Sequence, residues 1–143
     1  EIIANIGRLH VKLHQYHWYV KGPNFFALHE KLEELYDENE KYFDSFAERL
    51  IIEGLNPVST TEEIISNATI SESSSDKCLT AEEMIANLVK DYRHMQKLAE
   101  SAITLAGDAN DSVLEDMLIG YKEHIDKTIW MLQAYLGKKP VEE

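Results

Sequence analysis

The chain has 143 residues, 44% of them hydrophobic and 28% charged, which fits one soluble domain over residues 1–143 and excludes a disordered chain. The lone Cys78 excludes a disulfide framework within the chain and suits a reducing, cytoplasmic location, and no apolar run approaches the roughly 20 residues of a membrane span. The net charge of −12 should repel nucleic acid and attract cations.

Two helices are predicted in the first third of the chain. Apolar residues at helical spacing define the first helix: Ile2, Ile6, Leu9, Leu13, Tyr16 and Val20. The sequence Gly22-Pro23-Asn24 should end it and begin the next, with Asn24 as N-cap. The second helix should end near Gly54, and its apolar stripe consists of Leu28, Leu32, Leu35, Tyr42, Phe46 and Leu50.

A long connection follows over residues 55–79. Thr60 and Glu63 have the spacing of a capping box, which predicts a short helix inside it, and the run 73–75 of three serines is typical of a loop.

Two further helices are predicted after this connection. Thr80 and Glu83 form a second capping box, and Gly107 should close the helix that contains Met84, Leu88, Met95, Leu98, Ala102 and Leu105. Ser112 and Glu115 should open the last helix, whose inward residues are Leu114, Leu118, Tyr121, Ile125, Leu132 and Leu136. Two hairpins joined by one long crossover indicate an all-α, ferritin-like four-helix bundle.

The second helix has an acidic face opposite its apolar stripe. This face contains Glu30, Glu34, Asp37 and Glu48, with Glu33 and Asp44 beside it. Taken alone, such a face is most often just the solvated side of a surface helix.

Two histidines near this face indicate a possible metal site. His17 lies about one turn before the end of the first helix and His29 about one turn after the start of the second, so antiparallel packing places them at a similar height. Asp44 and Glu48 follow at i, i+4 spacing. Imidazole and carboxylate ligands together suit iron, zinc or manganese.

One chain cannot bring all four groups to one ion. Fifteen residues of helix separate His29 from Asp44, about 22 Å, whereas a metal–ligand bond is about 2 Å long. Either there are two separate half-sites, or a second copy of the chain completes the site. In the second case two copies of this helix cross antiparallel about a two-fold axis near residue 38, and the dimer holds two identical sites.

A di-iron site inside one bundle is disfavoured. Such sites use Glu-x-x-His motifs, which this chain lacks; the nearest pattern is Asp91-x-x-His94, expected on an exposed helix face.

Three stretches of the chain resemble the Dps family, the miniferritins. They are LHQYHWYVKGPNFFALHEKLEELYD, DSFAER and, more weakly, TIWMLQAYL. The resemblance implies a hollow shell of twelve subunits. It implies that His17 and His29 come from one subunit and Asp44 and Glu48 from its two-fold partner, around one or two iron ions.

The resemblance also implies roles for other residues. Glu33 matches an auxiliary metal position. Trp18 matches an aromatic residue beside the site, which would quench radicals or pack at the dimer interface. The cavity face that nucleates ferric mineral would comprise Glu30, Glu34 and Asp37, and the three-fold entry pores would be lined by Asp116 with Asp111 and Glu115.

The expected activity is that of a ferroxidase and iron store that consumes hydrogen peroxide. Two alternatives are a nucleoid-condensing protein that binds DNA and a purely structural helical oligomer. No DNA binding is expected for the chain as given, because Lys138 and Lys139 near its end are offset by Glu142 and Glu143 and its beginning is not basic.

Overall fold

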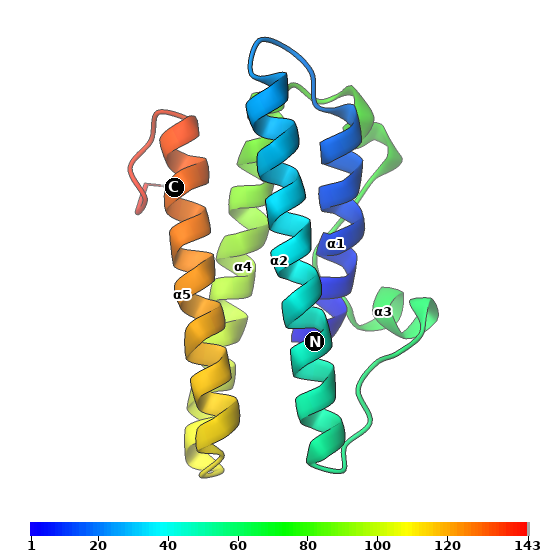
Figure 1. The fold of residues 1–143 in the computed structure, drawn as a ribbon, viewed down its shortest axis with the longest axis vertical. Coiled ribbons are helices and arrows are strands. Elements are labelled where there is room, and N and C mark those ends of the chain that lie inside the picture. Colours follow the sequence, from blue (N-terminus) through cyan, green and yellow to red (C-terminus); the bar gives the residue numbers. More distant parts are fainter. Residues whose placement is uncertain (143) are drawn as a thin grey trace. The chain divides into compact units, whose positions relative to one another are not determined.

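Four long helices and two short ones make up most of the protein. The computed structural model describes residues 1–142 (Figure 1). In chain order the elements are α1 (Ile2–Tyr19), α2 (Phe25–Ile52), α3 (Thr61–Asn67), the 3-10 helix η1 (Ser74–Cys78), α4 (Ala81–Asp108) and α5 (Ser112–Tyr135). The described residues contain no strand, which confirms the predicted all-α class, and none of their helices is long and apolar enough to cross a membrane. The chain divides into two compact units, Glu1–Met84 and Ile85–Glu143.

In the first unit, α1 and α2 lie side by side and bury facing apolar stripes. The buried residues of these stripes include Ile6, Leu9, Leu13, Tyr16, Leu28, Leu32, Leu35 and Phe46, all at predicted positions. Each such side chain contributes about 1.5–3 kcal/mol when it is fully removed from water. The buried side-chain amide of Asn39 donates to the carbonyl of Ile6 at 2.7 Å and so fixes the height of one helix against the other.

The turn between α1 and α2 is short. Asn24 is the N-cap of α2 as predicted, but its side chain makes no capping hydrogen bond. Gly22 has a φ of +113°, a backbone conformation that side chains with a Cβ rarely adopt, so the sharp return of the chain depends on a glycine at this position.

The crossover is tied to α1 by polar side chains. The predicted capping box is present, with Thr60 as N-cap of α3 and Glu63 reaching back to its backbone. Asn5 accepts hydrogen bonds from the backbone N–H groups of Thr69 and Ile70 at 2.7 and 2.8 Å. Lys12 donates to the carbonyl of Ser71 at 2.9 Å.

The serine run is only partly a loop. Ser73 accepts a hydrogen bond from the N–H of Ser75 and caps η1, so Ser74 and Ser75 are helical where the sequence predicts loop. The cause is local, because serine hydroxyls bond readily to backbone N–H groups two residues on. Tyr16 fixes this segment by donating to the carboxylate of Asp76 at 3.0 Å.

The ends of α4 and α5 correct two details of the sequence reading. Gly107 lies within the last turn of α4, and the left-handed residue that follows the helix is Asn110, with a φ of +59°. A Cβ on Gly107 would lie 3.2 Å from a carboxylate oxygen of Glu115, so glycine permits this close approach. Asp111, not Ser112, is the N-cap of α5, because its carboxylate accepts from the N–H of Leu114 at 3.1 Å.

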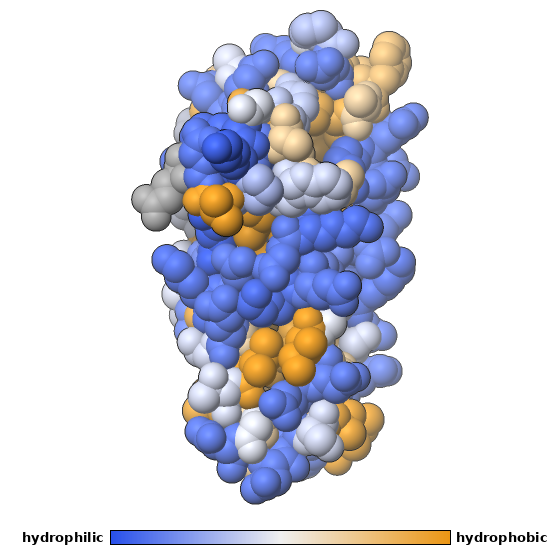
Figure 2. Space-filling view, turned by 90° about the vertical axis from the view of Figure 1, so that its left-hand side faces the viewer, coloured by the Kyte–Doolittle hydropathy of each residue, from blue (hydrophilic) through white to orange (hydrophobic). Residues whose placement is uncertain are grey.

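Polar contacts connect α4 and α5 in the second unit. Gln96 donates to Asp126 at 2.6 Å, and Lys122 lies 2.8 Å from Asp126 and 3.6 Å from Glu100. Leu105, assigned to the apolar stripe of α4, is 69% exposed. Figure 2 shows a mainly hydrophilic surface with small, separate islands of apolar side chains.

Candidate metal centre

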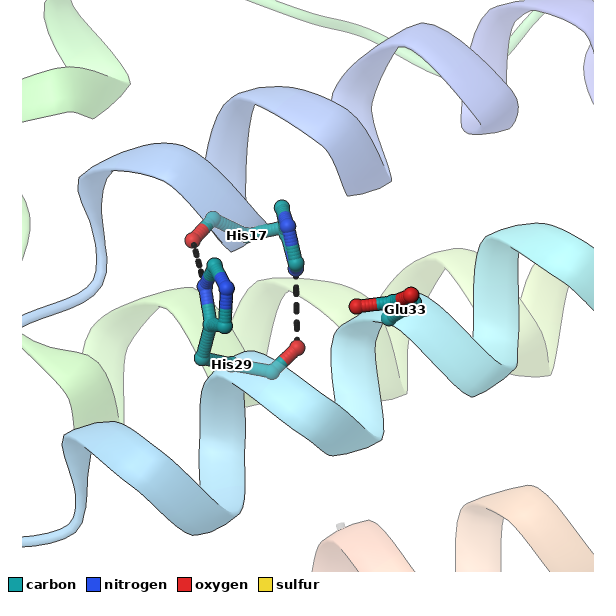
Figure 3. Close-up of side chains that lie close together, drawn as sticks. All are labelled: His17, His29 and Glu33. Carbon is teal, nitrogen blue, oxygen red and sulfur yellow. Dashed lines mark hydrogen bonds between the residues drawn. The ribbon is translucent and has the colours of Figure 1, made fainter.

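The end of α1 and the start of α2 bring His17 and His29 together (Figure 3). His17 is buried and His29 is half-buried. Their rings stack with centroids 3.6 Å apart and planes 20° from parallel. The prediction that two histidines twelve residues apart lie at matched height is therefore confirmed.

Reciprocal hydrogen bonds fix both rings. Nδ1 of His17 lies 2.8 Å from the carbonyl oxygen of His29, and Nδ1 of His29 lies 2.9 Å from the carbonyl oxygen of His17. A carbonyl oxygen only accepts, so in each ring Nδ1 carries the proton and donates. In the neutral imidazole Nε2 then has a free lone pair. Metal-binding histidines are commonly oriented by such a bond from the other ring nitrogen.

Glu33 completes a group of three possible ligands. It lies one helical turn after His29 on α2, and Figure 3 shows its carboxylate beside the ring of His17. One ligand atom from each of His17, His29 and Glu33 lies within 4.8 Å of the others. Two imidazoles and a carboxylate form a donor set suited to Fe²⁺ and to similar divalent ions.

Asp44 and Glu48 do not join this group. They lie on α2, which runs without a break from Phe25 to Ile52, and both are exposed. Fifteen residues of helix place Asp44 about 22 Å from His29 along the axis. Within the part of the chain that the structure describes, the one clustered ligand set of three or more is that of His17, His29 and Glu33.

Aromatic residues extend the site along the α1–α2 contact, and sequence reasoning missed most of them. Tyr36 lies edge-on to His17, with ring centroids 5.3 Å apart, and stacks on His14 at 3.9 Å. Trp18 is 66% exposed and its ring centroid lies 5.4 Å from that of His14. The spacing of His10, His14 and His17 at i, i+4 and i+7 is the signal that could have revealed this row.

Desolvation affects the phenol of Tyr36. Partial burial, followed by the negative charges of Glu33 and Asp37, raises the pKa of Tyr36 above its ordinary value of 10. Tyr36 therefore stays protonated at neutral pH.

The predicted acidic face of α2 is exposed. Glu30, Glu34 and Asp37 all lie at the surface. Glu34 pairs with Lys31 at 2.8 Å, an exposed i, i+3 pair of the kind that contributes little to stability.

The three acidic residues assigned to a pore have different surroundings. Asp111 caps α5, Glu115 is half-buried against Gly107, and Asp116 is exposed. They do not form a clustered ligand set among the described residues. Asp91, expected on an exposed face, is buried, because its position on α4 falls beside the buried Tyr92 and Leu88.

Known proteins match this chain over almost its whole length. A family model for the ferritin-like domain matches residues 1–140. The DNA protection during starvation protein of Listeria monocytogenes is 41% identical over 140 residues, which cover 98% of this chain and 90% of that protein.

Solved structures agree with this match. The X-ray structure of Dps from Listeria monocytogenes has a TM-score of 0.95 at 41% identity and covers 98% of this chain and 91% of that one. Dps from Listeria innocua, in a structure soaked with zinc, has a TM-score of 0.94 at 41% identity and covers 98% and 94%. The predicted ferritin-like fold is therefore confirmed.

Proposed function

Because the chain belongs to the Dps family of ferritin-like proteins, we propose that it is an iron-storing and iron-detoxifying ferroxidase. It would oxidise Fe²⁺ with hydrogen peroxide at sites shared between subunits of a twelve-chain cytoplasmic shell and keep the product as ferric mineral. The observation that carries this proposal is the locked pair of His17 and His29, with both Nε2 atoms free beside Glu33.

The missing half of the site is expected from a second copy of the chain. In an antiparallel pair of α2 helices, the midpoint between His29 and Glu48 coincides with the midpoint between Glu33 and Asp44, between residues 38 and 39. One two-fold axis at that point would bring both carboxylates of one copy to the histidines of the other.

Exposed apolar side chains lie next to both half-sites and support this pairing. Trp18 follows His17, and Phe26 precedes His29 by three residues and is 80% exposed. Ile51 and Ile52 follow Glu48 by three and four residues and are also exposed. Large exposed apolar groups that surround polar ligands are typical of a surface covered by a partner.

The chemistry follows from the ligands. Imidazole and carboxylate capture Fe²⁺, and the harder Fe³⁺ product prefers carboxylate and oxide oxygen. Two ferrous ions each give up one electron, and one hydrogen peroxide accepts both, so that its O–O bond breaks and its oxygen ends as water or hydroxide. Both reactants that would form hydroxyl radical are consumed. Glu30, Glu34 and Asp37 would bind the ferric product in the cavity, and Asp116 with Asp111 and Glu115 would attract Fe²⁺ at the pores.

Direct DNA binding is not favoured for this chain. Of its 14 basic residues, several are tied to acidic groups or carbonyls of the same chain: Arg8, Lys12, Lys31, Lys41, Arg49, Arg93 and Lys122. We propose that any protection of DNA comes from removal of iron and peroxide. A mobility shift of duplex DNA at neutral pH and moderate salt would contradict this.

Mixed assemblies test the shared site. His29→Ala and Asp44→Ala each damage every site of a uniform assembly. In a dimer of one of each, one site lacks both ligands and the other is native, so peroxide-driven oxidation of Fe²⁺ should recover well above either parent.

The matched control mixes His29→Ala with His17→Ala. Both changes affect the histidine half, so each site of this mixed dimer is damaged and no recovery is expected. Light scattering should give a particle close to twelve times 16.4 kDa in all cases. Equal activity of the two kinds of mixed particle would refute the shared site.

A further inference from the structure

Phe25, the first residue of α2, stacks on the histidine of the candidate metal centre that lies on the same helix. The ring centroids of Phe25 and His29 lie 5.1 Å apart, and the ring planes are 28° from parallel. His29 also stacks on His17 of α1, at 3.6 Å and 20°. The imidazole of His29 therefore has one stacked neighbour on each of the two helices.

The first turn of α2 brings Phe25 and His29 together. Their side chains are four residues apart, a spacing that places them one above the other on the same face of a helix. The N-cap, Asn24, makes no side-chain cap hydrogen bond. Backbone bonds hold this turn instead, from the N–H of Phe25 to the carbonyl of Gly22 at 3.1 Å and from the N–H of Leu28 to that of Asn24 at 3.0 Å.

His29 depends on a stacked neighbour more than His17 does. His17 is only 6% exposed, so the surrounding core restricts its ring, and Tyr36 lies edge-on to it at 5.3 Å. His29 is half-buried. Its Nδ1 donates to the carbonyl of His17 at 2.9 Å, which fixes one atom of the ring but leaves its tilt open. A flat side chain stacked on the imidazole restricts that tilt.

Core packing alone does not account for Phe25. Its side chain is half-buried, whereas Leu28 and Leu32 of the same helix are buried in the apolar stripe. Any apolar side chain of similar volume can fill a core position, but a stacked contact with an imidazole needs a planar ring.

We propose that Phe25 is a positioning residue of the metal centre, whose ring holds the imidazole of His29 in the orientation that binds the ion. This role rests on the proposed function, in which His29 is a metal ligand. Without the ring of Phe25, the imidazole has more freedom before the ion binds, and ordering it then weakens binding.

Titration of the assembled protein with Co²⁺, followed by visible absorption, tests this role. The absorption band that is lost in His29→Ala reports the ion bound by His29. Phe25→Leu keeps an apolar side chain but removes the planar ring, so it should weaken this Co²⁺ about five- to tenfold. Phe25→Tyr restores a planar ring and should bind Co²⁺ as the native chain does.

Phe43→Leu is the matched control. Phe43 is also a half-buried phenylalanine of α2, but its ring lies near Gly7 instead of a histidine. Phe25→Leu and Phe43→Leu should both assemble and should lower the Tm by similar amounts. Only Phe25→Leu should change the affinity for Co²⁺.

Three outcomes would overturn the role of Phe25 and leave the proposed metal centre intact. They are native Co²⁺ affinity in Phe25→Leu, equal weakening in Phe25→Leu and Phe43→Leu, and no recovery in Phe25→Tyr. If His29→Ala binds Co²⁺ with the affinity and the spectrum of the native chain, both the metal centre and the role of Phe25 are refuted.

Discussion

The two ends of α2 hold the proposed metal ligands in opposite ways. Near its start, His29 is fixed by hydrogen bonds to His17 and lies beside Glu33, so one chain positions this half completely. Near its end, Asp44 and Glu48 are exposed and form no part of a clustered ligand set in the described chain. The difference teaches that folding alone positions one half of the proposed site, whereas the other half would be completed only by the proposed assembly.

The largest effect should come from removing one ligand from either half. His29→Ala and Asp44→Ala should each lower the initial rate of peroxide-driven Fe²⁺ oxidation by about 100-fold or more. Their effects on folding should differ, because the His29 change also removes the hydrogen bond that its Nδ1 donates to the carbonyl of His17. Thermal unfolding of the assembled protein should show a lower Tm for His29→Ala alone; equal losses of Tm would contradict the comparison.

A smaller effect on Fe²⁺ oxidation is expected from a change at Glu33. This residue lies beside His17 and His29 of the same chain, but it is exposed. Glu33→Gln keeps the shape and removes the charge, so it should slow Fe²⁺ oxidation about tenfold with little change in stability. Glu34→Gln, its neighbour on the acidic face, is the control. Stopped-flow absorbance at limiting iron distinguishes them, and similar rates for the two variants would remove Glu33 from the site.

At the start of α5, a hydrogen-bonded carboxylate and an exposed carboxylate again lie close together in the sequence. Asp116 is exposed, so Asp116→Asn should slow iron uptake a few-fold at limiting iron and low salt, through weaker attraction of cations.

Asp111 caps the helix, so Asp111→Ala should cost about 1 kcal/mol of stability, whereas Asp111→Asn should keep the cap. Urea unfolding and uptake rates measured on all three variants test this; a stable Asp111→Ala would exclude the capping role.

The smallest effect concerns acid stability near α3. Hydrogen bonds from the backbone of Ser59, and then of Thr60, hold the pKa of Glu63 below its usual 4.5. A carboxyl with a lowered pKa in the folded state stabilises the protein above about pH 4.5 and loses this contribution as pH falls through the lowered value. Glu63→Gln should flatten the dependence of Tm on pH in that window, and Glu62→Gln, an exposed neighbour, should not. Parallel curves for the two variants would argue against the capping box.

Sequence alone predicted the helices because their signals are local. The apolar period of α2 and the capping boxes at Thr60 and Thr80 each depend on residues within one or two turns. The N-cap of α5 was predicted wrongly because two adjacent residues could serve. Asp111 and Ser112 are both good N-caps, and only the path of the turn decides between them.

The site was predicted as far as helix geometry extends. The similar heights of His17 and His29 on their helices predicted that the two lie together. The length of α2 showed that Asp44 lies too far from His29 to bind the same ion within one chain. The surroundings of these ligands were not predictable in the same way. The stacking of Tyr36 on His14 and the buried Nδ1 of His10 depend on how α1 packs against α2, which no single helix pattern encodes.

The unbroken course of α2 has a consequence for how this protein can change. Each residue added to a helix rotates all that follows by about 100° and advances it by about 1.5 Å. A single insertion between Glu33 and Asp44 would turn the carboxylates away from the histidines they are proposed to meet, and by symmetry would do so in both sites at once. Residues 53–60 of the crossover are not part of a helix, so an insertion there would not rotate the ligands relative to one another. The spacing along α2 is therefore as necessary to the proposed shared site as the ligands themselves.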